Sequence, residues 1–127
     1  MTAPVSGPIL LIDDDELIAG SLSDYLRAKG FSVDVALEPA SAAECMRGRQ
    51  YKVVLVDPYL TGGVHGTSVS LIAAIRASQP DSYIIILTGY GSTTLLELAS
   101  GDRLTTVLYK PQSIASISEA IHRSEAL

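Results

Sequence analysis

The strongest constraint on the fold is a set of short apolar runs that alternate along the chain with segments of helical spacing. Three of the five runs are continuous, and continuous apolar runs are typical of strands that are covered on both faces. Such strands belong to parallel sheets with helices on both sides. The predicted strands are Ile9–Ile12, Phe31–Ala36, Val53–Val56, Tyr83–Leu87 and Thr105–Tyr109.

Segments with apolar residues three and four positions apart lie between these strands and predict five helices. The first is expected to end at Gly30, the second runs from Pro39 to about Gly48, and the third ends near Pro80. The fourth covers about residues 93–100. Core positions are predicted in the first helix at Ile18, Leu22, Tyr25 and Leu26, in the third at Val69, Ile72 and Ile75, and in the last at Ile114, Ile117 and Ile121. This alternation predicts a doubly wound α/β fold with a five-stranded parallel sheet and right-handed crossovers.

The length of 127 residues suits one domain, so we expect a lead-in at residues 1–7, a single domain at 8–127 and no effector domain. No apolar run approaches the roughly 18 residues that a membrane helix needs, and no secretory signal is visible. We therefore expect a cytoplasmic protein without membrane contact. The net charge of -5 argues against direct nucleic-acid binding, which needs a basic face.

Chemically active side chains follow four of the five predicted strands. Acids follow the first strand at Asp13–Asp15 and the third at Asp57, a hydroxyl follows the fourth at Thr88, and an ammonium follows the fifth at Lys110. Ligands bind beyond the carboxyl ends of strands in open α/β sheets, so these groups are expected to converge on one edge.

Each group also has a simpler explanation when it is taken alone. Acids are common in the first turn of a helix, Asp57-Pro58 can be a turn, Thr88-Gly89 can be a cap, and Lys110 can be solvated. Taken separately, these explanations do not account for the presence, at four strand ends, of side chains that could all take part in one reaction. Crowded carboxylates favour Mg²⁺, and a carboxylate can act as a nucleophile that forms an acyl phosphate.

Over about residues 8–125 the chain resembles the receiver domains of two-component response regulators. The order and the strand-end placement of four motifs carry the resemblance: Ile9–Asp15, Val53–Asp57, Ile86–Gly91 and Leu108–Pro111. The resemblance implies a flavodoxin-like sheet with strand order 2-1-3-4-5, in a stand-alone regulator similar to those of chemotaxis.

By this resemblance, Asp57 accepts a phosphoryl group from a sensor histidine kinase or a histidine phosphotransfer protein. The implied cofactor is Mg²⁺, held by Asp13, Asp14, Asp57 and the backbone carbonyl of Tyr59. The chain would then signal through contact with a downstream protein or by onward phosphotransfer. It would be no enzyme beyond its own phosphotransfer and autodephosphorylation.

The resemblance further implies that Thr88 and Lys110 contact phosphoryl oxygens and that the peptide bond before Pro111 is cis. The chain departs from the family where a proline usually follows the acceptor, since Thr61 stands there. Val107 stands where the family often has an aromatic switch residue. These departures leave the catalytic set complete and alter the set that transmits the signal.

Further departures concern three tyrosines and Gln112, which stands where a phenylalanine is common. Tyr109 lies two residues beyond Val107, on the same side of the strand, so we expect either that it substitutes partly for the missing switch residue or that the switch is weak. Tyr59 and Tyr90 stand at the two positions that, in this family, flank the path that water takes to the phosphorus. The output face has few charges, so we expect a monomer or a weak homodimer through the first and fifth helices.

Two other functions fit parts of the pattern. A binding module with the receiver fold that ignores phosphate is favoured by the altered switch residues and disfavoured by the complete catalytic set. A haloacid dehalogenase-like phosphatase would use Asp13 as the nucleophile of an Asp-x-Asp motif, with Asp15 as its second acid. Leu17 stands where that family has Thr or Val, and no late acidic pair follows the lysine.

Overall fold

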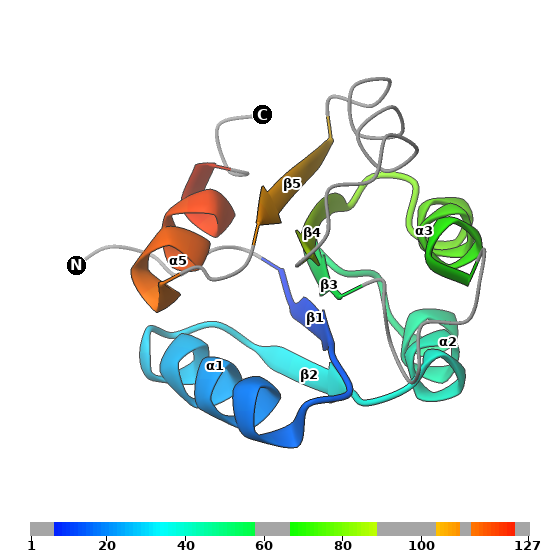
Figure 1. Ribbon diagram of the computed structural model, residues 1–127. Helices are drawn as coiled ribbons and strands as arrows, with labels where there is room; N and C mark the ends of the chain where they lie inside the picture. The colour runs from blue at the N-terminus through cyan, green and yellow to red at the C-terminus, as the bar shows by residue number, and fades with distance from the viewer. Residues whose placement is uncertain (1–6, 58–66, 89–103, 110–112, 124–127) are drawn as a thin grey trace.

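The computed structural model describes residues 7–57, 67–88, 104–109 and 113–123, with the backbone only at 67–70, 88, 109 and 114. Its strands form one parallel sheet in the order β2-β1-β3-β4-β5, which confirms the doubly wound α/β prediction (Figure 1). The strands are β1 (Ile9–Ile12), β2 (Val33–Ala36), β3 (Val53–Val56), β4 (Tyr83–Thr88) and β5 (Thr105–Tyr109).

Helices cover both faces of the sheet, with α1 and α5 on one face and α2 and α3 on the other (Figure 1). The described helices are α1 (Glu16–Ala28), α2 (Pro39–Gly48), α3 (Thr67–Ser78) and α5 (Ile114–Arg123). The helix expected at about residues 93–100 lies outside the described residues, as does the lead-in at 1–6. No helix in the described ranges is long and apolar enough to cross a membrane.

Two buried clusters explain why the central strands are apolar at every position. Along β1, Ile9 and Leu11 pack into the cluster beneath α1 and α5, whereas Leu10 and Ile12 pack into the cluster beneath α2 and α3. Successive side chains of a strand point to opposite faces, so a strand between two helical layers must be apolar throughout. β3 behaves in the same way, and all of Val53–Val56 is buried.

Two details of the predicted elements were wrong. β2 begins at Val33 and not at Phe31, because the Phe31 amide donates to the Leu26 carbonyl at 3.1 Å and closes the end of α1. Gly30 adopts φ 99° in this closing turn, a conformation that favours glycine. Ile18 was expected in the core but is 43% exposed, because the buried stripe of α1 is formed by Ala19, Leu22, Ser23 and Leu26.

A network of buried polar groups joins the elements at the amino-terminal edge of the sheet. Gln79 is fully buried, and its Oε1 accepts from the Tyr51 amide at 2.8 Å. Its Nε2 donates to the carbonyls of Met46 (3.3 Å) and Arg49 (3.0 Å) at the end of α2. The Ser82 hydroxyl donates to the Tyr51 carbonyl. One side chain therefore connects the end of α3 to the end of α2 and to the start of β3.

Arg76 extends this network toward β5. Its Nη1 donates to three carbonyls between α3 and β4, those of Gln79, Pro80 and Ser82, at 2.8–3.1 Å. Its Nη2 donates to the Leu104 carbonyl at 3.3 Å and to the Thr105 hydroxyl at 3.2 Å. These bonds hold the start of β5 against the end of α3.

The outer edge of β2 is covered by side chains. Arg27 Nη2 donates to the Val33 carbonyl at 2.8 Å. Asp34 accepts from Arg49 Nη1 at 2.8 Å and from the Tyr51 hydroxyl at 2.6 Å. Burial, with this bond to Asp34, raises the pKa of Tyr51, so the phenol stays protonated as a donor.

The buried position of Gln79 predicts a large loss of stability when its polar atoms are removed. Gln79→Leu keeps the approximate volume but leaves an amide and two carbonyls without their partner, which costs about 3 kcal/mol of unfolding free energy. Urea unfolding followed by circular dichroism measures this loss. Gln50→Leu makes the same change at an exposed position and should alter stability by about 0.5 kcal/mol or less. Equal losses in the two variants would contradict this role of Gln79.

Candidate functional site

The carboxyl ends of β1 and β3 lie side by side and bring two aspartates together. Ile12 of β1 pairs with Val56 of β3. Asp13 directly follows β1, and Asp57 directly follows β3. The Asp57 amide donates to the Ile12 carbonyl at 3.0 Å, and the Asp13 amide donates to the Ala36 carbonyl of β2 at 3.1 Å. Neighbouring strands are about 4.8 Å apart, so the backbone holds these two acids at one edge of the sheet.

The acids at this edge differ in their exposure to solvent. Asp13 is 2% exposed, Asp57 is half-buried and Asp14 is exposed. Asp13 Oδ1 accepts a hydrogen bond from the Asp15 amide at 3.0 Å, which fixes this buried carboxylate within its own turn. The half-buried Asp57 can therefore meet an incoming group while Asp13 stays covered.

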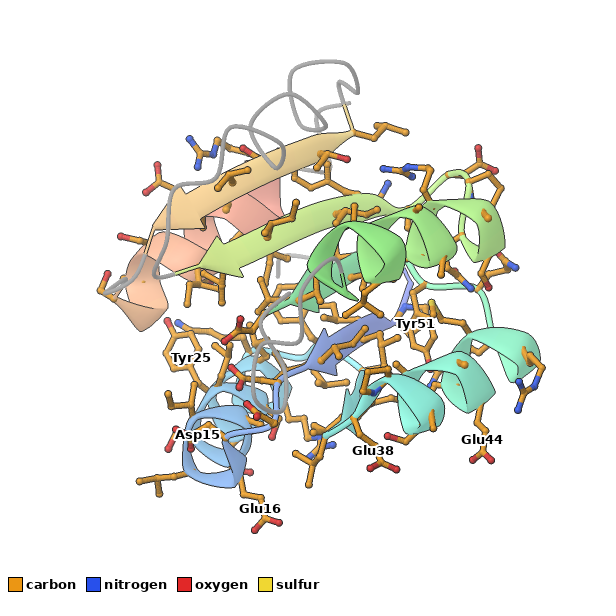
Figure 2. All side chains as sticks on the ribbon, turned by 45° about the vertical axis from the view of Figure 1, so that its right-hand side comes forward. Asp15, Glu16, Tyr25, Glu38, Glu44 and Tyr51 are labelled. Carbon is orange, nitrogen blue, oxygen red and sulfur yellow. The ribbon has the colours of Figure 1, made fainter. Side chains whose placement is uncertain are left out.

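Asp15, the third acid of the run, caps helix α1. Its carboxylate accepts from the amides of Leu17 (3.0 Å) and Ile18 (3.2 Å), and Figure 2 shows it at the start of the helix beside Glu16. The simple explanation of acids at a helix start therefore holds for Asp15. An aspartate directly before a helical segment is a sequence signal for such a cap. Sequence reasoning alone left the role of Asp15 open.

The donor chemistry of this edge fits Mg²⁺. Within the described part of the chain, no three His, Cys, Asp or Glu side chains form a group spaced to hold a metal ion by themselves. Mg²⁺ does not need such a cage, because it keeps several waters and commonly binds through one or two carboxylates. The two aspartates on adjacent strands, with the exposed Asp14 beside them, supply carboxylate oxygens of that kind.

Other predicted site residues are described only in part or not at all. Thr88 ends β4 and pairs with Tyr109 of β5, so the backbones of both strands end at the same edge. The side chains of these two residues lie outside the described set. Four further residues of the predicted site lie outside the described ranges: Tyr59, Tyr90, Lys110 and Pro111. Thr61 and Gln112, which depart from the family pattern, also lie outside them.

Val107 is described, and it packs against the buried cluster beneath α2 and α3. It is only half-buried there. An aliphatic side chain in this position contributes to packing and cannot move between two orientations as a large aromatic ring can.

Sequence reasoning missed an apolar pair beside the aspartates. Leu17 is 79% exposed and Ile18 is 43% exposed in the first turn of α1. Among the described residues, these two are the large hydrophobic side chains that are exposed to solvent. The helical spacing placed Ile18 in the core because its position lies only one residue from the buried stripe.

Comparison with known proteins gives one consistent result. Residues 9–122 match the family described as "Response regulator receiver domain". The chain is 27% identical over 120 residues to the photosynthetic apparatus regulatory protein RegA of Rhodobacter capsulatus, covering 94% of this chain and 64% of that protein. It thus spans under two thirds of the length of this relative.

Solved structures of differently described proteins share the fold of this chain. A response regulator from Burkholderia pseudomallei with a phosphorylated aspartic acid, a calcium ion and citrate has a TM-score of 0.76 and is 31% identical, covering 94% of this chain and 71% of that one. A protein described as adenylate cyclase from Rhodopirellula baltica has a TM-score of 0.78 and is 27% identical, covering 92% of this chain and 85% of that one.

The crowding of the acids predicts that removal of one charge stabilises the metal-free protein. Asp57→Asn should raise the free energy of unfolding by about 1 kcal/mol, because carboxylates at one edge repel each other. Saturating Mg²⁺ should stabilise the wild type more than the variant. Thermal unfolding with and without Mg²⁺ measures both effects.

Asp81→Asn is the matched control, since Asp81 is exposed in the turn before β4 at the other sheet edge. Its stability should change by about 0.5 kcal/mol or less under both conditions. A loss of metal-free stability in Asp57→Asn would contradict the repulsion.

Proposed function

This chain belongs to the family of response regulator receiver domains, and from that premise we propose that Asp57 accepts a phosphoryl group in a Mg²⁺-dependent reaction. Receiver domains are signalling domains that histidine kinases or histidine phosphotransfer proteins phosphorylate. The observation that carries the assignment to Asp57 is its position. It is a half-buried carboxylate directly after β3, next to the buried Asp13 on the neighbouring strand.

The chemistry assigns a role to each carboxylate. An Asp57 oxygen forms a bond to phosphorus while the bond between phosphorus and the donor histidine nitrogen breaks. The electron pair of the broken bond stays on the histidine nitrogen, and the departing imidazole is neutral because its other ring nitrogen carries a proton or because it takes one from water. Asp57 is suited to this attack because it is only half-buried, while the bond of its amide to the Ile12 carbonyl holds its backbone in place.

Asp13, Asp14 and Asp57, with the backbone carbonyl of Tyr59, would hold Mg²⁺ in this proposal. The ion, when bound, supplies positive charge that offsets the carboxylates and the phosphoryl oxygens. Thr88 and Lys110 would bind the remaining phosphoryl oxygens. A relative that is 31% identical, whose structure is described with a phosphorylated aspartic acid and a calcium ion, supports this arrangement.

The proposed phosphodonor is a protein, a sensor histidine kinase or a histidine phosphotransfer protein. The exposed apolar pair Leu17 and Ile18 supports this, because it lies in the first turn after the acidic run. An exposed apolar pair this close in sequence to the acids offers contact area that a macromolecular partner can use and a small phosphodonor does not need. Output would be contact with an unidentified downstream protein or onward phosphotransfer, from a monomer or weak homodimer in the cytoplasm.

A second candidate, a receiver-fold module whose binding ignores phosphate, is favoured by one observation. Val107 packs against the core where the family often has a mobile aromatic residue. In the leading proposal, Tyr109 takes over part of this function. The phosphatase alternative is weakened, because its second acid, Asp15, is engaged as the cap of α1.

The first functional prediction is Mg²⁺-dependent labelling of Asp57 by acetyl phosphate. The wild type should be labelled with Mg²⁺ and unlabelled after chelation, and Asp57→Asn should take up no label. Asp14→Ala should weaken Mg²⁺ binding and labelling together. Electrophoresis that separates phosphorylated from unmodified protein measures the label.

Asp81→Asn serves again as the control and should be labelled like the wild type. Label found on Asp13 would support the phosphatase instead. Undiminished label on Asp57→Asn would overturn the site assignment.

The second functional prediction is a long-lived phosphorylated state. Water must reach the phosphorus in line with the Asp57 oxygen, and Tyr59 and Tyr90 are bulky at the two positions that flank this path in the family. We propose that they slow hydrolysis, so Tyr59→Asn and Tyr90→Glu should lose the label faster. The decay of labelled protein in Mg²⁺ measures the rate, with Tyr51→Phe at the opposite sheet edge as control. Unchanged or slower decay in both tyrosine variants would refute the shielding.

A further inference from the structure

Asp15 has no role in the proposed phosphotransfer, yet it is bonded on both sides of the turn that carries the acids. Its amide donates to Asp13 Oδ1 at 3.0 Å. Its own Oδ1 accepts from the amides of Leu17 at 3.0 Å and Ile18 at 3.2 Å. The same residue therefore contacts the buried carboxylate and the start of α1.

The cap fixes where the helix begins. The first amides of a helix have no partner within the helix, and a capping side chain supplies one. Asp15 has the extended backbone typical of a capping residue, with φ -85° and ψ 102°. Because one oxygen accepts both amide bonds, the carboxylate is directed at the helix end (Figure 2).

Asp14 lies between two residues whose positions are fixed. On one side, Asp13 is 2% exposed and its amide donates to the Ala36 carbonyl of β2 at 3.1 Å. On the other side, Asp15 is fixed by its bonds to α1. The exposed Asp14 thus starts from a backbone that is held at both ends, although its own side chain faces solvent.

We propose that Asp15 is a positioning residue for the Mg²⁺-binding carboxylates, and that it acts as a hydrogen-bond acceptor and not through its negative charge. Without the cap, the Asp15 amide is no longer held in place to orient Asp13, and Asp14 has only one fixed neighbour. The proposal rests on the proposed function for the identity of the ion.

The test separates position from charge by substituting residue 15 and titrating Mg²⁺ into the metal-free, unphosphorylated protein by calorimetry. Asp15→Asn and Asp15→Ser keep a capping acceptor and remove the charge, so both should bind Mg²⁺ within about twofold of the wild type. Asp15→Ala removes the acceptor and should bind about fivefold more weakly or worse. Glu16→Ala removes an exposed acid from the same turn without touching the cap, and should match the wild type.

Asp15→Ala can lose helical structure as well as Mg²⁺ affinity, so the circular dichroism of each variant is measured beside its titration. If Asp15→Ala fails to fold, the affinities of the Asn and Ser variants decide the test. Loss of affinity in the Asn and Ser variants, as large as in the Ala variant, would show that charge or direct ligation matters and would overturn the proposal. Wild-type affinity in Asp15→Ala, or equal loss in Glu16→Ala, would overturn it too.

Labelling by acetyl phosphate, measured on the same variants, keeps this inference distinct from the proposed function. If the wild type takes up no label while the titrations follow the expected order, the proposed function fails and the positioning role stands. If the wild type is labelled and Asp15→Ala binds Mg²⁺ normally, the positioning role fails alone. A wild type that binds no Mg²⁺ would refute the positioning role.

Discussion

The in-register parallel pairing of β1 with β3 is the interaction on which both the core and the candidate site depend. Ile9–Ile12 pair residue by residue with Val53–Val56, and Asp13 and Asp57 follow directly after the two strands. All eight side chains are buried, so the apolar pattern alone does not distinguish this register from one shifted by a residue. Backbone bonds continue the observed register beyond both ends. The Lys52 amide bonds to the Pro8 carbonyl before the pairing, and the Asp57 amide bonds to the Ile12 carbonyl after it.

The sequence was sufficient for the architecture because its strongest signals are continuous apolar runs. β1, β3 and β5 were predicted with their observed bounds, and the doubly wound sheet followed from alternation with helices. The errors fall where one hydrogen bond decides, as at Phe31, which resembles a strand residue but bonds back to α1. Ile18 was misplaced because helical spacing fixes a face only to within about one residue, and the stripe that contains Ala19 is the buried one.

The candidate site was predictable to a smaller extent. The placement of Asp13 and Asp57 at one sheet edge follows from parallel strands, and the structure has it. The sequence carried a signal for a cap at Asp15 but left its role open, because an acid that faces the ligand also follows a strand and has the same side chain. Only the hydrogen bonds of Asp15 separate the two roles. The roles of Thr88 and Lys110 stay predictions from the family resemblance. The two edges of the sheet also differ: at the amino edge the polar groups of Gln79, Ser82 and Arg76 bond to one another or to backbone carbonyls, whereas at the carboxyl edge Asp13 and Asp57 lie on adjacent strands.

The covering of β2 has a consequence for the behaviour of the protein at high concentration. The carbonyls of Ser32 and Ala36 accept bonds from the amides of Ile9 and Asp13. The carbonyl of Val33 lies between them in the alternation and therefore faces away from the sheet. An outward carbonyl on an edge strand is a template for the addition of a strand from another molecule, the first step of aggregation. Arg27 occupies this carbonyl, and the ion pair of Arg49 with Asp34 places charge on the same strand. Strand addition is therefore opposed at Val33 by side chains that take no part in the chemistry.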